Sequence, residues 1–145
     1  SFHDFRAGDL LQPRPGVRVR TAPLPHPDGA TGYRIEHEGR AVAYVTDLEH
    51  RPGILDKAVV DLVRGADVMI YDASYTDEEF PARIGWGHST WQEALRIADA
   101  AAVARVVLFH HDPAHDDTAM DRIASAAAER RPGTLVAREG LTLSL

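Results

Sequence analysis

A chain of 145 residues with 44% hydrophobic and 7% aromatic residues has the length and composition of one globular domain, so we assign residues 1–145 to a single domain. The absence of cysteine excludes disulfides and thiolate metal sites, so any metal must be held by histidine and carboxylate groups. The net charge of −6 disfavours nucleic acid as a partner without excluding it. No stretch reaches the roughly 20 apolar residues of a membrane span, and no signal-peptide pattern is present, so we expect a cytoplasmic protein with no membrane partner.

The first half of the chain is predicted to form strands joined by turns. Alternating or continuous apolar residues, which are typical of strands, occur in three segments. The predicted strands are residues 17–21, 32–37 and 40–46. The last two flank Glu38-Gly39, a pair that favours a hairpin turn. Residues 1–16 and the proline-rich residues 23–29 are expected to form loops and a sheet edge.

The second half alternates helical and strand patterns. Helices are predicted from residue 54 to 64, after Thr90 and after Asp117, where Thr90 opens a capping-box pattern. Strands are predicted at residues 67–71 and 106–109, followed by a last hairpin of residues 134–137 and 141–145. Hairpins first and alternating strands and helices afterwards indicate a layered α/β domain with a mixed sheet.

Two of the predicted strands end in residue types that bind metals. The apolar run that ends at Phe109 is followed directly by His110, and the apolar run that ends at Val45 is followed by Thr46 and then Asp47. We expect the strand ending at Phe109 to be buried on both faces. Side chains at the carboxyl ends of such strands can converge on a pocket without disturbing the core. Imidazole and carboxylate are also the ligands that divalent metals take where thiolate is absent. The pattern therefore indicates a metal site and an enzyme.

Each candidate residue also has a purely structural interpretation. Asp47 alone could cap a helix or an Asx turn, and His26 could be a solvated loop residue. Residues 85–90 could be only a turn that leads into the capped helix, with Trp86 and Trp91 in the core. The combination favours a site, because four candidates lie in breaks beside predicted strands. These four are His26, Asp47, His88 and His110.

Four short motifs occur in an informative order. They are His26 six residues before Gly32-Tyr33-Arg34, the strand end Tyr44-Val45-Thr46-Asp47, the turn Gly87-His88-Ser89-Thr90, and the strand end Val107-Leu108-Phe109-His110, in which His110 lies 22 residues after His88. Over roughly residues 17 to 115 this order and spacing resemble the C-terminal half of the metallo-β-lactamase-fold hydrolases, in the branch of RNase Z and related phosphodiesterases.

The resemblance implies a fold, a reaction and a set of site residues. The fold is the C-terminal half of an αββα sandwich with a mixed sheet, and the reaction is hydrolysis of a small-molecule phosphodiester or other ester by a metal-bound hydroxide. Two divalent ions, zinc with manganese or iron as alternatives, would be held by His26 and His110 and bridged by Asp47. His88 would donate a proton to the leaving oxygen, a role that suits a side chain titrating near neutral pH.

One element of that family is absent from the sequence. The His-x-His-x-Asp-His motif of the N-terminal half does not occur, because no two of the eight histidines lie two positions apart. We therefore expect the domain to be partial, to need the N-terminal half or another copy of the chain as its partner, and to be inactive alone. The alternative is a non-catalytic binding or structural domain that kept the fold and lost the metal site.

Overall fold

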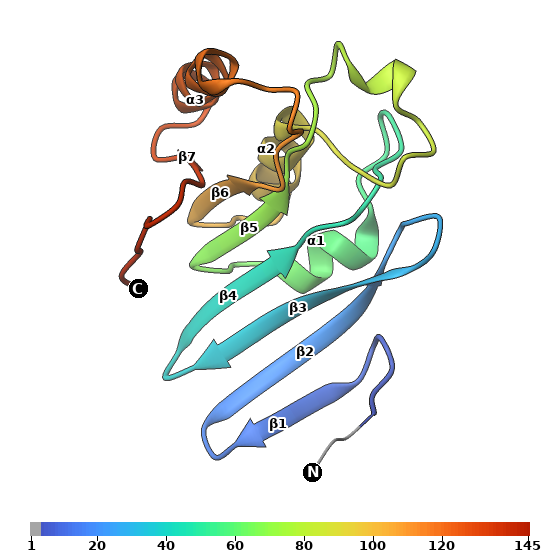
Figure 1. Cartoon of the computed structure of the whole chain (residues 1–145). Helices are drawn as coiled ribbons and strands as arrows, with labels where there is room; N and C mark the ends of the chain where they lie inside the picture. Colours follow the sequence, from blue (N-terminus) through green and yellow to red (C-terminus); the bar gives the residue numbers. More distant parts are fainter. Residues whose placement is uncertain (1–3) are drawn as a thin grey trace.

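Seven strands form one mixed sheet whose spatial order follows the chain (Figure 1). The structure, a computed structural model, describes residues 4–145. Neighbouring strands from β1 to β4 pair antiparallel, and those from β4 to β7 pair parallel. The strands are β1 (Leu10–Arg14), β2 (Val17–Leu24), β3 (Ala30–His37), β4 (Arg40–Val45), β5 (Val68–Asp72), β6 (Arg105–Phe109) and β7 (Leu135–Val136). The mixed α/β sheet predicted from the sequence is confirmed.

The β3–β4 hairpin forms where the sequence predicts it. Glu38 and Gly39 join the strands with φ angles of 48° and 78°, the left-handed conformation that a two-residue hairpin turn requires. β2 is longer than expected, because Pro23 and Leu24 still pair with β3. Part of the expected N-terminal loop forms the edge strand β1, where Pro13 is tolerated, and residues 1–3 of that loop lie outside the described residues.

The helices begin at side-chain caps carried by the sequence. They are α1 (Lys57–Val63), the 3₁₀ turn η1 (Phe80–Ala82), α2 (Trp91–Ala100) and α3 (Asp117–Arg130). Asp56, Thr90 and Asp116 each accept a hydrogen bond from a first-turn backbone N–H of the α-helix that follows. α1 therefore starts after Asp56 instead of at residue 54, and the cap of α3 is Asp116 instead of Asp117. None of the helices within residues 4–145 has the length and apolar character to cross a bilayer.

The predicted C-terminal hairpin is wrong. β7 adds to the sheet parallel to β6, with Val107 opposite Leu135 and Leu108 opposite Val136, and residues 141–145 form no strand. The physical reason is that α3 carries the chain back along the sheet, so that the next segment meets β6 in the same direction. A strand–helix–strand connection of this kind gives parallel pairing.

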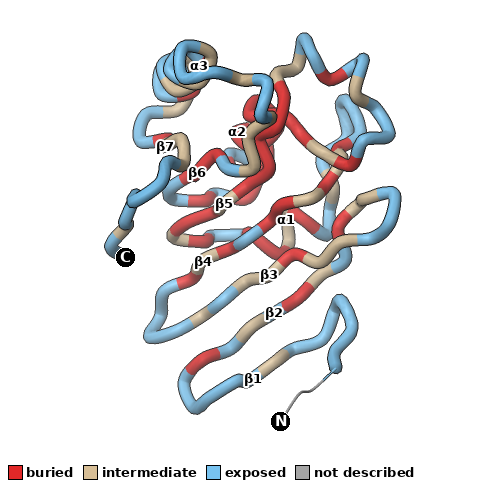
Figure 2. The backbone as a smooth tube through the Cα atoms, viewed as in Figure 1, coloured by how far each residue is buried: buried red, intermediate tan, exposed pale blue. Residues whose placement is uncertain are grey.

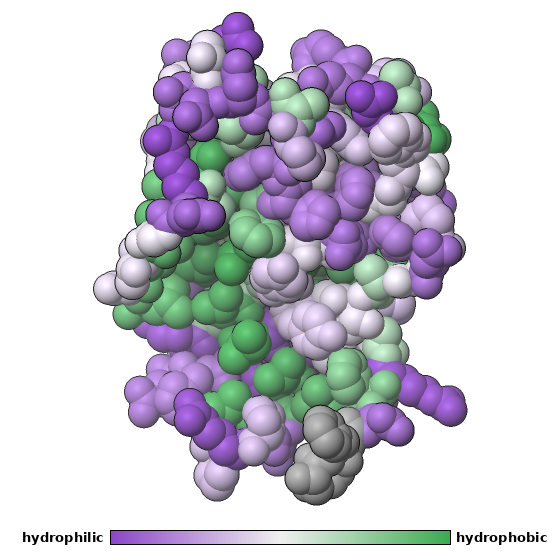
Figure 3. Space-filling model, viewed as in Figure 1, coloured by the Kyte–Doolittle hydropathy of each residue, from purple (hydrophilic) through white to green (hydrophobic). Residues whose placement is uncertain are grey.

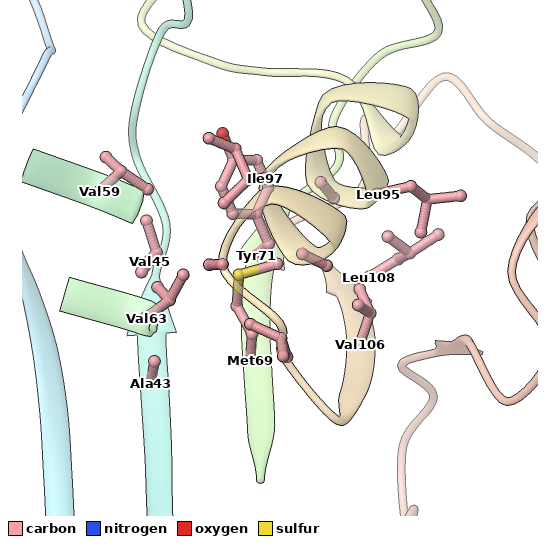
Figure 4. Close-up of a cluster of buried hydrophobic side chains, with 14 of the residues drawn as sticks. Ala43, Val45, Val59, Val63, Met69, Tyr71, Leu95, Ile97, Val106 and Leu108 are labelled. Carbon is pink, nitrogen blue, oxygen red and sulfur yellow. The ribbon is translucent and has the colours of Figure 1, made fainter. Parts of the chain in front are cut away.

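Helices α1 and α2 cover one face of the sheet (Figures 2 and 4). Alternate residues of the central strands point to these helices and are at most 1% exposed. They are Ala43 and Val45 of β4, Met69 and Tyr71 of β5, and Val106 and Leu108 of β6. The helices supply Val59, Val63, Leu95 and Ile97 to the same cluster. This layer holds the carboxyl ends of β4, β5 and β6 side by side.

The opposite face of the sheet is apolar and partly exposed. Ile35 is 42%, Tyr44 36% and Phe109 38% exposed, and the rings of Tyr44 and Phe109 lie 6.1 Å apart between centroids. Figure 3, which views this side, shows hydrophobic residues gathered across it. The expectation that the strand ending at Phe109 is covered on both faces is confirmed for Val106, Val107 and Leu108, which are at most 4% exposed, but not for Phe109 itself. We call the side of the sheet that carries Ile35, Tyr44 and Phe109 the open face.

Candidate metal centre

Four side chains with metal-binding chemistry meet at the carboxyl edge of the sheet. Asp47 follows β4, Asp72 ends β5, His110 follows β6, and His88 lies in the loop before α2. One ligand atom of each lies within 4.8 Å of the others, and this is the one such group found within residues 4–145. Parallel pairing of β4, β5 and β6 is the cause, because it places the three strand ends at one edge.

Two of these residues adopt a backbone conformation that side-chain-bearing residues rarely take. The φ angles are 59° at Asp47 and 60° at His110, both in the left-handed region. Each bends the chain directly after a strand, and the Nε2 atom of His110 lies 3.3 Å from Oδ1 of Asp47. Backbone strain of this kind is retained where surrounding structure enforces it and is concentrated at functional sites.

Asp72 organises the segments around it, although it is completely buried. Its Oδ2 atom accepts a hydrogen bond from the backbone N–H of Asp47 at 3.1 Å, and its Oδ1 atom accepts from the N–H groups of Ser74 and Ser89 at 3.1 and 3.2 Å. A buried carboxylate is stable only when its oxygens are paired in this way. Asp72 therefore ties the loop after β4 and the loop before α2 to the end of β5.

His88 is held by the same carboxylate. Its Nδ1 atom lies 3.1 Å from Oδ2 of Asp72 and 3.8 Å from Oδ1 of Asp47. Because an ionised carboxylate only accepts hydrogen bonds, Nδ1 of His88 is the donor to Asp72, and Nε2 is left for other partners. The half-buried ring also meets the edge of Tyr75, with centroids 6.1 Å apart. His88 is therefore fixed in orientation beside Asp47 and His110.

Sequence reasoning missed Asp72, although the signal was present. The segment 68–71 is an apolar run that ends in an aspartate, the same pattern that singled out Asp47. The same criterion applied to all three strand ends would have singled out Asp72 as well. No sequence pattern indicates that this carboxylate accepts hydrogen bonds from two other loops, because the donors lie up to 25 residues away from it in the chain.

His26 does not belong to the group of four. It lies in the loop between β2 and β3, where its Nδ1 atom accepts a hydrogen bond from the backbone N–H of Asp28 at 3.1 Å. The Nε2 edge of its ring lies against Gly87, the residue before His88, so closely that a β-carbon at Gly87 would overlap Nε2. The structure therefore places His26 beside the loop that carries His88.

Gly87 offers a test of whether His26 is a ligand. We expect Gly87→Ala to weaken metal binding by the full-length protein, because the new methyl group overlaps the His26 ring and displaces it. Gly85→Ala is the matched control: φ is 90° at Gly85 and 87° at Gly87, so both substitutions carry a similar backbone cost of about 1–2 kcal/mol, but Gly85 has open space around it. Metal titration of both variants checks this. Equal metal affinities would remove His26 from the ligand set.

A buried polar network supports the loop before α2. His50 is 7% exposed, its Nδ1 atom lies 2.8 Å from Oγ of Ser89, and its ring stacks on Phe80 with centroids 4.1 Å apart. Burial lowers the pKa of His50, because the imidazolium form loses its hydration. Burial likewise raises the pKa of Tyr71, which lies in the same region of the core. Both groups are therefore neutral in the folded protein at neutral pH.

The lowered pKa of His50 predicts loss of stability in mild acid. The unfolded chain binds a proton at His50 more readily than the folded chain, so stability present above about pH 6.5 decreases as the pH falls below it, by at most about 1.4 kcal/mol per pH unit for one group. Urea unfolding from about pH 7.5 to about pH 5.5, compared with His50→Asn, measures this contribution. An unchanged pH slope in the variant would contradict it.

The residues of the group fit a metal ion. Two carboxylates and two imidazoles form a donor set that suits zinc, manganese or iron, and the side chain of Asp47 is 51% exposed, which leaves its oxygens accessible. Both oxygens of Asp72 already accept hydrogen bonds from the protein. Asp47 and His110 are thus the members most available to a metal. Two ligands cannot by themselves hold two ions, since catalytic sites supply about three protein ligands per ion.

Sequence comparison places the chain in a known superfamily. Residues 2–111 match the beta-lactamase superfamily domain. The ribonuclease Z of Brevibacillus brevis is 30% identical over 103 residues, which are 68% of this chain and 31% of that protein. The chain therefore spans about a third of the length of this curated relative.

Solved structures show the same fold. Human tRNase Z, short form, superimposes with a TM-score of 0.71 at 23% identity over 93% of this chain and 46% of that one. Zinc-bound PqqB from Methylobacterium extorquens gives a TM-score of 0.71 at 21% identity over 97% of this chain and 51% of that one. The seven-stranded sheet is thus about half of the fold in those proteins. The chain belongs to the metallo-β-lactamase superfamily, in its RNase Z-like branch.

Proposed function

We propose that the full-length protein is a metal-dependent hydrolase that cleaves a phosphodiester or another ester bond. The observation that carries the proposal is the convergence of Asp47, Asp72, His88 and His110 at the carboxyl edge of the sheet. The family supports the same reaction type, because curated relatives are named ribonuclease Z. The net charge of −6 favours a small-molecule substrate over a long nucleic acid.

Asp47, His110 and His26 are the residues that we propose as metal ligands. The carboxylate of Asp47 has two oxygens and can contact two ions, whereas each neutral imidazole offers one lone pair to one ion. When bound, two divalent ions would activate water and neutralise charge on the substrate oxygens. The chain's own contribution is to hold these ligands on strand ends and loops that the core keeps in place.

We propose that His88 moves the proton that the leaving group needs. The contact from Nδ1 to Asp72 leaves Nε2 available to the substrate, and the buried carboxylate stabilises the protonated ring. Asp72 is then a positioning residue, because it acts through His88. General acid catalysis of this kind contributes about a hundredfold to ten-thousandfold in rate.

The remaining ligands must come from outside the group described. The open face, with Ile35, Tyr44 and Phe109 exposed, is proposed to pack against the half of the sandwich that the chain lacks relative to its structural neighbours. Two arguments favour this occupant over a second copy of the chain. The chain covers 46% and 51% of two superimposed structures, and Phe109 lies directly before His110, so a segment on this face would reach the site.

Asp47 provides the test of the proposal. We expect Asp47→Ala in the full-length protein to lose most bound metal and its hydrolysis of bis(p-nitrophenyl) phosphate, because the substitution removes the carboxylate that would hold the ions. Asp99→Ala is the control, since Asp99 pairs on the surface with Arg131 and should change neither quantity. Elemental analysis and a release assay measure both. A full-length protein without metal and without turnover would favour the alternative, a binding domain that lost its metal site. The observation that favours this alternative is that residues 1–145 contain no His-x-His-x-Asp-His motif.

A further inference from the structure

The loop between β5 and α2, the yellow-green segment of Figure 1, carries an exposed tryptophan close in sequence to His88. Trp86 is 60% exposed, whereas Trp91 is buried, so the purely structural interpretation that put both in the core fits only Trp91. It lies two residues before His88, and a two-residue separation places α-carbons at most about 7 Å apart. An indole at this position is within reach of a substrate held at His88.

Trp86 is fixed and not merely exposed. A single oxygen of Glu49, Oε2, accepts hydrogen bonds from the N–H of Gly85 at 2.6 Å and of Gly87 at 3.0 Å. The two residues that flank Trp86 are therefore both tied to the segment that follows Asp47. The backbone of the tryptophan is held on both sides by the same carboxylate.

One face of the indole is already supported. The guanidinium carbon of Arg83 lies 4.9 Å from the centroid of Trp86 and 5.8 Å from that of Tyr75, and the Tyr75 ring contacts His88. The Nε atom of Arg83 is buried without a hydrogen-bond partner in residues 4–145. Because Arg83 covers one face and the residue is still mostly exposed, the other face is open. We call Trp86, Arg83 and Tyr75 the aromatic platform.

We propose that the aromatic platform binds a flat ring of the substrate, so that the full-length protein prefers phosphoesters that carry an aromatic group. This rests on the proposed hydrolase, and it adds the part of the substrate that lies beside the phosphate. Stacking orients the ring, and the positive charge of Arg83 strengthens the electrostatic attraction of the anionic ester. The preference follows from a rigid indole placed next to the candidate proton donor.

Binding of two non-hydrolysable probes tests the platform. Phenylphosphonate and methylphosphonate share the anionic group and differ in the ring, so calorimetric titration of the metal-loaded full-length protein isolates the contribution of the ring. We expect phenylphosphonate to bind about tenfold more tightly, which corresponds to about 1.4 kcal/mol. Trp86→Ala should abolish this difference without changing methylphosphonate binding, and Trp86→Phe should retain most of it.

Ile84→Ala is the matched control, because Ile84 is 59% exposed in the same loop; it should bind both probes as the parent does. Equal affinity of the parent for both probes, or an unchanged preference in Trp86→Ala, would overturn the platform. Fluorescence quenching by acrylamide gives a second measurement: protection of Trp86 by phenylphosphonate supports it, and a Trp86 already shielded in the free protein overturns it. These binding measurements do not depend on hydrolysis, so failure of the proposed reaction would appear as absent turnover of bis(p-nitrophenyl) phosphate in the separate assay, with ring binding intact.

Discussion

Replacing His88 by alanine is expected to lower turnover of the full-length protein by a factor of about a hundred to ten thousand while leaving its metal content nearly intact. The reason is that His88 is bound through Nδ1 to Asp72 and offers only Nε2 to the site. Loss of the ring removes the proposed proton donor and leaves Asp47 and His110 in place. Parallel assays of turnover and bound metal check this expectation.

A second variant separates the role of the proton donor from that of its support. Asp72→Asn keeps the shape of the side chain but removes the charge that orients and stabilises the protonated ring of His88. We expect turnover to fall, with a changed dependence of rate on pH, while metal content stays near that of the parent. If His88→Ala instead loses as much metal as Asp47→Ala, then His88 is a ligand and the proposed role is wrong.

Residues 1–145 purified alone are expected to show no metal-dependent hydrolysis and to associate in solution. The group at the sheet edge supplies too few ligands to hold two ions, and the open face leaves Ile35, Tyr44 and Phe109 in water. Soluble monomers rarely expose a large contiguous apolar surface. Light scattering and a phosphodiester assay with added zinc or manganese, run beside the full-length protein, measure both properties.

Substitution on the open face sharpens this experiment. Tyr44→Lys places a charge in the middle of the apolar surface, and Glu78→Gln in an exposed loop is the control, because it changes the net charge by the same amount. We expect only the first to reduce association of residues 1–145. A monomer that turns over substrate with added metal would show that residues 1–145 form a complete catalyst, and the proposed partner segment would then be unnecessary.

The local sequence determined the secondary structure wherever the signal was contained within a few residues. The turn at Glu38-Gly39 and the cap at Thr90 formed as predicted, because left-handed φ angles and the capping hydrogen bond depend on neighbours in the chain. The C-terminal hairpin failed for the opposite reason. Whether residues 135–136 pair with a following segment or with β6 depends on the path that α3 takes across the sheet.

For the candidate site, the sequence by itself determined which residue types follow the strands, and so it singled out Asp47 and His110, while the turn motif Gly87-His88-Ser89-Thr90 singled out His88. Tertiary structure alone decided that Asp72 is the carboxylate that binds His88, and that Trp86 is exposed whereas Trp91 is buried. The physical reason is that hydrogen bonds between separate loops and the exposure of a side chain depend on which segments meet in space. The parallel pairing of β4, β5 and β6 brings those segments together, and no short-range pattern encodes it.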